Sequence, residues 1–144
     1  MIRAATKDDL DAVYGLIRQL SRHYFTKEQF EPCYLHNLKY NHILVCEYNK
    51  HIGGCGILCI HYSLHYSQKS AEVVNLIVDE NARNCGIGKE LLTSLEKIAI
   101  DNECVYLEVS SGKQREAAHR FYEREGFALT HYKLTKKLPY RSNF

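Results

Sequence analysis

The sequence predicts a mixed α/β fold (an α+β mixed sheet), built as a single domain over residues 1–144. Two observations lead to this prediction. Apolar residues recur with helical spacing in some segments and alternate or run together in others, as helices and strands require. No internal repeat, linker or low-complexity segment divides the chain. The predicted order of elements is β-α-α-β-β-β-α-β-α-β, and a domain of this length can bury roughly two-thirds of its unfolded surface.

The first elements are a strand over residues 2–5 and two helices. Thr6 is the predicted N-cap of the first helix, because threonine side chains accept hydrogen bonds from helical N–H groups. The apolar face of this helix consists of Leu10, Val13, Tyr14, Ile17 and Leu20. A second helix begins after Thr26, with Gln29 completing a capping box. Pro32 should limit the regularity of that helix.

The middle of the chain changes to strand periodicity. Residues 42–48 and 51–64 flank Asn49-Lys50, which is typical of a hairpin turn. Residues 67–70 are polar and predict a loop. The strand that follows, over residues 71–79, is apolar almost throughout, as in strands that are buried on both faces.

The last part of the chain alternates between helix and strand. An amphipathic helix is predicted over residues 87–101 and a strand over residues 104–110, so that a parallel crossover joins this strand to the preceding one. A further helix covers residues 115–125 and ends at Gly126, a typical C′ residue. Residues 127–138 alternate and predict a final strand.

Composition and charge exclude several classes of protein. The chain is 45% hydrophobic, with 11 Tyr, 5 Phe and a net charge of +2, which is unlike a disordered protein. Its charges are scattered and form no basic stripe, so we expect no nucleic-acid partner. The longest stretch without charged or strongly polar residues, 52–60, is much shorter than the ~20 residues that span a bilayer, and we expect no membrane partner.

The cysteines indicate free thiols rather than a disulfide framework. The N-terminal segment becomes charged at once and shows no signal peptide, so we expect a cytoplasmic protein. Disulfides are rare in that compartment. The six cysteines include no C-x-x-C pair, and we predict no metal site from them.

A glycine-containing turn lies between the predicted strand over residues 71–79 and the helix that follows. Its sequence is R-N-C-G-I-G, residues 83–88. Glycines at a strand-to-helix turn let main-chain N–H groups converge, and the helix N-terminus adds a partial positive charge, so the turn could hold a phosphate. A dinucleotide fingerprint would need glycine in place of Leu91, and a Walker loop would need Ser or Thr in place of Glu90. The glycines could also serve only a tight turn.

Two segments resemble the GCN5-related N-acetyltransferase (GNAT) superfamily. V-D-E-N-A-R-N-C-G-I-G-K-E-L-L (residues 78–92) matches its R-x-x-G-x-G signature, and A-H-R-F-Y-E-R-E-G-F (residues 118–127) matches its A-x-x-F/L-Y-x-x-x-G-F segment. Element order and length agree over almost the whole chain. The resemblance implies a GNAT-like domain that uses acetyl-CoA as co-substrate.

The resemblance also assigns residues to roles. In the family, main-chain groups of the strand before the loop bind the pantetheine arm and the acetyl group, and amides of the loop bind the pyrophosphate. The corresponding residues are Leu76, Ile77 and Val78 for the strand, and Arg83, Asn84, Cys85, Gly86, Ile87, Gly88 and Lys89 for the loop. Tyr122 corresponds to the family's general acid, since a phenol can donate a proton as charge develops on the leaving sulfur. Arg115 stands where the family often has asparagine. Tyr122 could instead only pack in its helix.

The attacking amine must lose a proton before it can react. An alkylamine is neutral in roughly one molecule in 2,500 at pH 7, which corresponds to a penalty of roughly 4–5 kcal/mol. Glu108 matches a position used as base in the ribosomal-protein branch of the superfamily, and Glu72 is the alternative. Both could also be solvated strand residues, and a pocket that favours the neutral amine would need no base.

A closer resemblance concerns the acceptor. D-A-V-Y (residues 11–14), H-Y-S-L-H-Y (residues 61–66), A-H-R-F-Y and R-E-G-F are similar to segments of aminoalkylphosphonate N-acetyltransferases. A phosphonate would need cationic or hydrogen-bonding partners. The candidates are Arg22, His23, Tyr24, His61, Tyr62 and His65. His61 and His65 could also ligate a divalent metal, since their i, i+4 spacing would suit a helix, whereas in a strand they would lie about 13 Å apart on one face; solvated histidines at a strand end are the alternative.

Together these observations predict an N-acetyltransferase that acts on a small-molecule amine by direct attack in a ternary complex. Two alternatives remain, namely a protein or peptide N-acetyltransferase and a domain that binds acyl-CoA without turnover. Alternation after Phe127 would permit a homodimer through the final strands.

Overall fold

The computed structural model describes residues 1–21 and 24–139. The chain divides into two compact units, Met1–Val109 and Ser110–Phe144. Arg22 and His23, two of the candidate acceptor-binding residues, lie outside the described residues.

The first unit contains a five-stranded sheet in the order β1-β2-β3-β4-β5. The strands are β1 (Ile2–Ala4), β2 (His42–Tyr48), β3 (His51–Ser63), β4 (Gln68–Val78) and β5 (Leu107–Val109). Neighbours are antiparallel except β4 and β5, which are parallel. This confirms the predicted crossover, because α3 (Ile87–Asp101) connects the two parallel strands.

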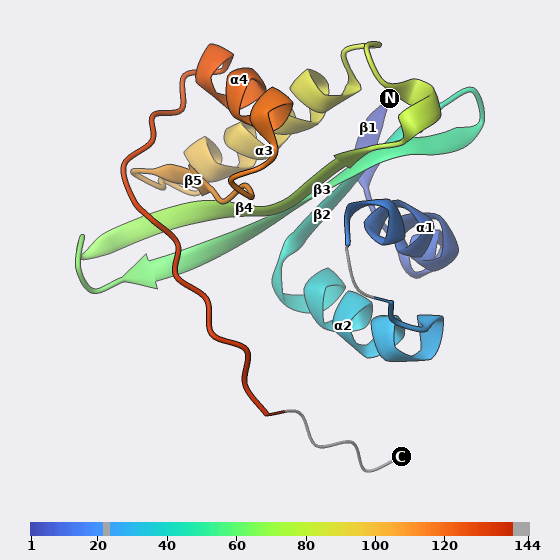
Figure 1. Cartoon of the computed structure of the whole chain (residues 1–144), viewed down its shortest axis with the longest axis horizontal. Coiled ribbons are helices and arrows are strands. Elements are labelled where there is room, and N and C mark those ends of the chain that lie inside the picture. Colours follow the sequence, from blue (N-terminus) through green and yellow to red (C-terminus); the bar gives the residue numbers. More distant parts are fainter. Residues whose placement is uncertain (22–23, 140–144) are drawn as a thin grey trace. The chain divides into compact units, whose positions relative to one another are not determined.

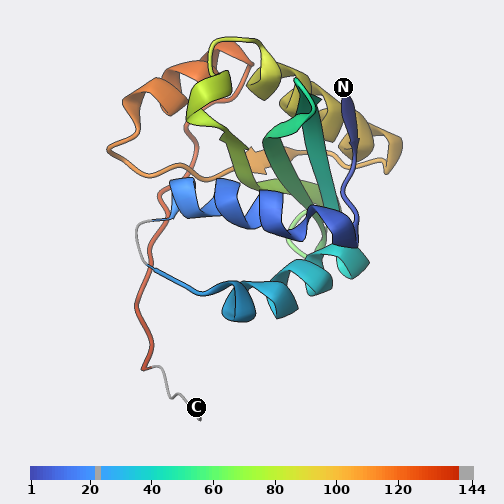
Figure 2. The same cartoon turned by 90° about the vertical axis from the view of Figure 1, so that its right-hand side faces the viewer.

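Helices cover both faces of this sheet. Figures 1 and 2 show α1 (Leu10–Leu20) and α2 (Lys27–Tyr40) on one face and α3 on the other. α3 has the bounds that the sequence predicts, and its buried residues are Ile87, Leu91, Leu92, Leu95 and Ala99. None of the helices among the described residues is both long and apolar enough to cross a membrane.

The predicted N-cap at Thr6 and the predicted capping box at Thr26 are both present. Thr6 caps the short 3-10 helix η1 (Lys7–Asp9) that leads into α1, and Thr26 caps α2 with Gln29. α2 does not end at Pro32, which lies inside the helix. The hairpin turn between β2 and β3 has positive φ at both Asn49 and Lys50, as a type I′ turn requires.

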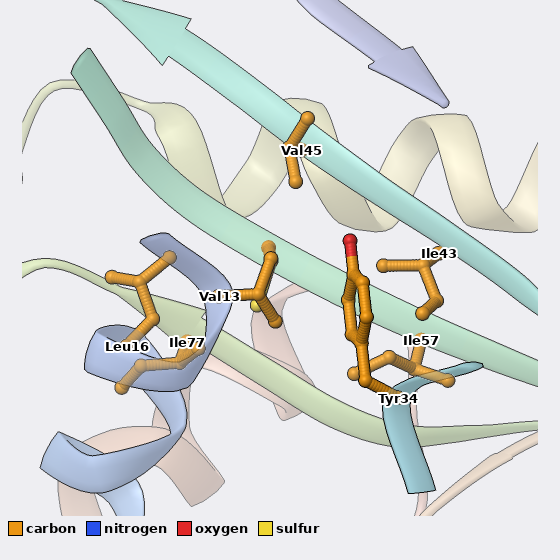
Figure 3. Packing of buried hydrophobic residues seen from close by; sticks show 8 residues of the cluster. Val13, Leu16, Tyr34, Ile43, Val45, Ile57 and Ile77 are labelled. Carbon is orange, nitrogen blue, oxygen red and sulfur yellow. The ribbon is translucent and has the colours of Figure 1, made fainter. Parts of the chain in front are cut away.

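The main apolar core lies between the sheet and the first two helices. Figure 3 shows Val13 and Leu16 of α1 and Tyr34 of α2 packed against inward-facing strand residues. These strand residues are Ile43, Val45, Cys55, Ile57 and Ile77. The hydroxyl of Tyr34 donates to the carbonyl of Thr6 (2.7 Å), so its polar end is satisfied inside the core.

On the opposite face, glycines of β3 let α3 approach the sheet closely. A Cβ added to Gly54 would lie 2.9 Å from Cγ2 of Ile87, and one added to Gly56 would lie 2.8 Å from Cδ1 of Leu95. A real Cβ atom this near to a neighbour would force that neighbour to move. Glycine at these positions therefore determines how closely α3 packs against the sheet.

β4 and β5 differ from the sequence prediction by several residues. β4 begins at Gln68, so the loop predicted over residues 67–70 is largely strand, paired in register with the end of β3. The pairing satisfies the main chain, and polar side chains are tolerated there because this end of the hairpin is largely exposed. β5 is confined to Leu107–Val109 within the predicted residues 104–110. β4 is also not buried on both faces throughout, since Val74 is 37% exposed.

The second unit contains α4 (Glu116–Arg124), which ends as predicted at Gly126 (φ +95°). The amide of Gly126 donates to Glu123 and the amide of Phe127 donates to Tyr122, the two bonds of a Schellman motif. The rings of Tyr122 and Phe127 meet edge to face with centroids 5.6 Å apart, which supplies the apolar contact of the motif.

The prediction of a final strand over residues 127–138 is wrong. This segment has no assigned strand in the described part of the chain, and Leu129, Tyr132 and Leu134 are 86%, 82% and 93% exposed. Alternation shows that a segment can form a strand with two distinct faces, but a strand exists only where main-chain partners pair with it.

Candidate active site

β4 carries a β-bulge at Val74, which is the extra residue opposite the Ile57–Leu58 step of β3. The pairing between β4 and β5 covers Ala71–Val73 and ends directly before the bulge. A bulge bends its strand and disrupts the local ladder. Beyond Val73 the edge of β4 on the β5 side is therefore open within the sheet of the first unit.

Main-chain groups of two predicted site residues face this open edge. The amide of Asp79 donates to Gly53 of β3 (2.8 Å), so Ile77 also faces β3, because main-chain groups alternate along a strand. Leu76 and Val78 then face the other side. The sequence-predicted residues Leu76, Ile77 and Val78 thus divide, with Leu76 and Val78 presenting main-chain groups and Ile77 burying its side chain in the core.

The glycine loop, residues 83–89, turns from β4 into α3. Asn84 and Gly86 have positive φ (65° and 80°), and Gly86 is the N-cap of α3. The first bond within the helix runs from the amide of Glu90 to the carbonyl of Gly86 (3.1 Å), so the amides of Ile87 and Gly88 are not used inside the helix. They lie at its partially positive end, where anions are favoured.

The outer side of the loop is open to solvent. Arg83, Asn84, Cys85 and Gly86 are exposed, whereas Ile87 is 4% exposed and fixes the loop to the sheet. Nε of Arg83 donates to the carbonyl of Val78 (3.4 Å) and so closes the loop onto the end of β4. The Cys85 thiol donates weakly to the hydroxyl of Tyr48 (3.7 Å).

A shallow depression of about 570 Å³ lies beside this end of α3. Its lining residues are Ile2, Gly86, Lys89, Glu90, Thr93 and Ser94. The depression therefore borders the loop only at Gly86 and Lys89, on the side of α3 that faces Ile2 of β1, and Lys89 adds a cation at its rim.

Glu72 and Glu108, here called the acidic pair, are direct cross-strand neighbours on β4 and β5. Residues in register on adjacent strands point to the same face, so the two carboxylates share one side of the sheet. Nε2 of His61 lies 3.2 Å from Oε1 of Glu72. Cys59 is the cross-strand partner of Glu72, and burial together with the Glu72 charge raises the pKa of its thiol.

The acidic pair lies on the face of the sheet that α1 and α2 cover nearer the start of β3. Cys55 and Ile57 of the apolar core precede Cys59 and His61 along β3 with the same alternation. The core therefore passes into a polar, partly exposed patch at Cys59, His61 and Glu72.

Tyr122 is buried in the second unit, 8% exposed, with its ring against those of Phe121 and Phe127. Burial raises the pKa of its phenol, because the charged phenolate is poorly solvated there, and the positive charge of Arg115 opposes this shift. The phenol therefore stays protonated at neutral pH.

The other sequence candidates are dispersed. Tyr24 is 72% exposed, and the guanidinium of Arg18 lies 4.6 Å from the centre of its ring. Tyr62 is 83% exposed on β3. His65 lies in the turn after β3, where its ring contacts that of Tyr66. Among the described residues no group of three or more His, Cys, Asp or Glu side chains could hold a metal ion.

Two features of this region were missed by sequence reasoning. The bulge at Val74 cannot be recognised from the sequence, because a strand that is apolar almost throughout shows no alternation that a bulge could interrupt. Gln19 of α1 contacts the segment between β4 and the glycine loop, and an exposed helical glutamine gives no signal of such a contact. The glycines Gly53, Gly54 and Gly56 did carry a signal, because clustered glycines within a strand indicate a bulge or a close approach.

Comparisons with known proteins identify the family of the chain. Residues 10–127 match the sequence profile of the Acetyltransferase (GNAT) family. The chain is 32% identical over 139 residues to an aminoalkylphosphonate N-acetyltransferase of Salmonella typhimurium, covering 95% of this chain and 90% of that protein.

Solved structures share the fold. A protein described as a transcriptional regulator from Bacillus halodurans superposes with a TM-score of 0.86 at 25% identity, covering 96% of this chain and 99% of that one. Glucosamine-6-phosphate N-acetyltransferase from Arabidopsis thaliana gives a TM-score of 0.81 at 20% identity, with 96% and 98% covered.

The fold and the family match together define an acyltransferase that uses acetyl-CoA as co-substrate. The chain belongs to the Acetyltransferase (GNAT) family. The predicted family, mixed fold and enzyme class are thereby confirmed. The acceptor, the residue roles, a homodimer, a cytoplasmic location and the absence of a nucleic-acid partner stay predictions.

Proposed function

We propose that this enzyme transfers the acetyl group of acetyl-CoA to the primary amine of a small molecule by direct attack in a ternary complex. The observation that carries the proposal is the open edge of β4 at Leu76 and Val78, followed after residues 79–82 by the exposed glycine loop at the N-terminus of α3. Main-chain donors and acceptors at the edge suit an amide-bearing arm, and the loop suits a pyrophosphate.

The residues that would bind the co-substrate are those predicted from the sequence, with one refinement. Leu76 and Val78 offer main-chain groups, of which the Val78 carbonyl also accepts from Nε of Arg83, whereas Ile77 supports them from the core. The amides of the glycine loop and the guanidinium of Arg83 supply donors to phosphate oxygens, and charge-assisted bonds of this kind are stronger than neutral ones.

The acidic pair is proposed to receive the proton of the acceptor amine. Two carboxylates on adjacent strands attract an ammonium group and can accept its proton directly or through water. Glu108 is the proposed base, with Glu72 as the alternative. The resulting neutral nitrogen bonds to the acetyl carbon as the carbon–sulfur bond breaks, and its second proton is lost to solvent.

Tyr122 is proposed to supply the proton that leaves with CoA as a free thiol. Its phenol regains a proton from solvent after each turnover, so protons balance. Its raised pKa keeps the phenol protonated at neutral pH, as a general acid must be before it acts, but also makes it a weaker proton donor.

An aminoalkylphosphonate is the proposed acceptor class. The support is the identity of 32% to a relative of that name over nearly all of both chains. The test is release of free thiol from acetyl-CoA with 2-aminoethylphosphonate, beta-alanine, ethylamine and basic and acidic peptides as acceptors.

We expect 2-aminoethylphosphonate to give the highest kcat/KM, with ethylamine as the control that lacks an anionic group. A faster peptide would favour a protein N-acetyltransferase. CoA binding without acetylation of any acceptor would indicate a binding domain. A stable acetyl-protein formed without acceptor would contradict direct attack.

The role of Tyr122 is tested by Tyr122→Phe. Phenylalanine keeps the ring that packs against Phe121 and Phe127, so the fold should be retained. We expect kcat to fall about 100-fold with little change in CoA affinity, as for loss of a general acid. Phe121→Tyr, which adds a hydroxyl one residue away, is the control for altered packing, and an unchanged kcat in Tyr122→Phe would remove the assignment.

A further inference from the structure

The segment between β4 and the glycine loop is a short 3-10 helix, η2 (Glu80–Ala82), preceded by Asp79. The first N–H groups of any helix lack partners within it. Oδ1 of Asp79 accepts from the amide of Asn81 (3.3 Å) and so caps one of them. The amide of Glu80 is left to another acceptor.

That acceptor comes from α1. Oε1 of Gln19 accepts from the amide of Glu80 (3.3 Å). Nε2 of the same side chain donates to Oδ1 of Asp79 (3.4 Å), the atom that caps Asn81. One glutamine thus satisfies the remaining amide and orients the capping carboxylate, although its position is distant from η2 in sequence.

The other side of this segment is fixed to the sheet. The amide of Asp79 donates to Gly53 of β3 (2.8 Å), and the amide of Ala82 donates to the carbonyl of Asp79 (2.8 Å). Ala82 is 3% exposed. The next residue, Arg83, begins the glycine loop, so the position of η2 determines where the loop starts.

We propose that Gln19 is a positioning residue for co-substrate binding. It holds η2 between α1 and the sheet and thereby orders the glycine loop for the pyrophosphate of CoA. This inference rests on the proposed function, which makes the loop the CoA site. If Gln19 served only to attach α1 to the sheet, its removal would lower stability and leave CoA affinity unchanged.

The test uses Gln19→Met, which keeps the length of the side chain and removes both hydrogen bonds. Ala12→Met is the matched control, because it places the same side chain at another exposed position of α1. The measurements are the Kd of CoA by calorimetry, KM and kcat for acetyl-CoA, and the melting temperature without ligand.

We expect Gln19→Met to raise the Kd of CoA and the KM of acetyl-CoA about three- to tenfold, which is the effect of one or two ordinary hydrogen bonds. The kcat at saturation should change less than about twofold. Ala12→Met should match the parent protein. Gln19→Glu, which retains an acceptor for Glu80 but places a charge beside Asp79, provides a second variant if Gln19→Met does not fold, and it should also weaken binding.

Arg83→Met separates this inference from the proposed function. If Arg83→Met weakens CoA binding and neither Gln19 variant does, the glycine loop is the CoA site and the positioning role of Gln19 is wrong. If Arg83→Met also leaves the Kd unchanged, the assignment of the loop itself is wrong.

Discussion

At the scale of single residues, Arg3 of β1 links its own strand to η1 and to β2. Its guanidinium donates to both carboxylate oxygens of Asp9 in η1 (2.8 and 2.9 Å) and to Glu47 of β2 (2.6 Å). The bonds from Arg3 lower the pKa of Asp9, which is itself buried, and the amide of Thr6 adds to this effect. An aspartate in this environment stabilises the fold only while it is ionised.

We therefore predict that acid weakens the protein partly through Asp9. Its pKa is lowered on folding, so its contribution is complete above the unfolded value near 3.9 and disappears as pH falls through the lower folded value. Asp9→Asn should lose about 1.5 kcal/mol of unfolding free energy at pH 7 and depend less on pH below about 4. Urea titrations at pH 7, 4 and 3 measure this, with the exposed Asp8→Asn as control. A parallel pH dependence in Asp9→Asn and the parent would contradict it.

The acidic pair should show a conflict between stability and activity. Like charges directly opposite on neighbouring strands destabilise a sheet, so Glu108→Gln should raise the unfolding free energy by about 0.5 kcal/mol. Acetyl transfer should fall in the same variant if Glu108 is the base. The matched variant Glu72→Gln is the comparison, and Glu96→Gln on α3 is the control. A loss of activity confined to Glu72→Gln would move the base to Glu72.

At this scale the sequence predicts contiguous sites well and tertiary contacts poorly. The glycine loop could be found because all its members are neighbours in the chain and its glycines have a conformational reason. The contact of Gln19 with η2 depends on where α1 crosses the sheet. No local pattern encodes that crossing.

At the scale of elements, the distance between α3 and the sheet depends on glycines of β3, which have no side chains to hold the helix away. A Cβ at Gly54 would lie 3.0 Å from the carbonyl oxygen of Ile77, which cannot move without breaking the ladder, and equally near Leu91. The glycines of β3 therefore determine how deeply the helix that carries the glycine loop is seated.

We predict that Gly54→Ala lowers the unfolding free energy by about 1–3 kcal/mol through overpacking and weakens CoA binding by displacing the start of α3. Gly15→Ala is the matched control. A Cβ there meets nothing within 4 Å, and alanine should stabilise the middle of α1 by about 0.5–1 kcal/mol. Denaturant titrations of both variants check the opposite signs, and equal effects would argue against close packing at Gly54.

Helices were predicted better than strands for a physical reason. A helix pairs its main chain within itself, so caps such as Thr6 and Thr26 and an apolar face are sufficient to locate it. A strand depends on a partner elsewhere. Residues 68–70 are strand because β3 pairs with them, whereas residues 127–138 have the alternation of a strand and no assigned pairing.

At the scale of the whole molecule, thiol reactivity should follow burial. Cys33 and Cys85 are exposed, whereas Cys46 and Cys55 are buried, and burial raises the pKa of Cys55 to about 12. We predict rapid labelling of Cys33 and Cys85 in the native protein by a thiol reagent, and of Cys46 and Cys55 only after unfolding.

CoA extends this prediction to the proposed site. Occupation of the glycine loop should slow labelling of Cys85 and leave Cys33 on α2 unchanged, as followed by mass spectrometry of alkylated peptides. Equal protection of both thiols would indicate a general change in stability instead.

The fold class was predictable because element order restricts topology more strongly than any boundary does. A strand, a helix and a second strand in that order favour a parallel pair, and β4 and β5 form one although β5 is much shorter than expected. Errors of a few residues at strand ends leave this arrangement unchanged.

Val74 also has a consequence for how variation in this chain should be interpreted. Its side chain is partly exposed, so most replacements should be silent, and a survey of amino-acid substitutions would rank the position as unimportant. Removal of the residue is different, because Val73 and Asn75 would then continue a regular ladder opposite Leu58 and Ile57. The deletion should therefore remove the bend that a bulge introduces into β4. What this position contributes is chain length, and only insertions and deletions can reveal it.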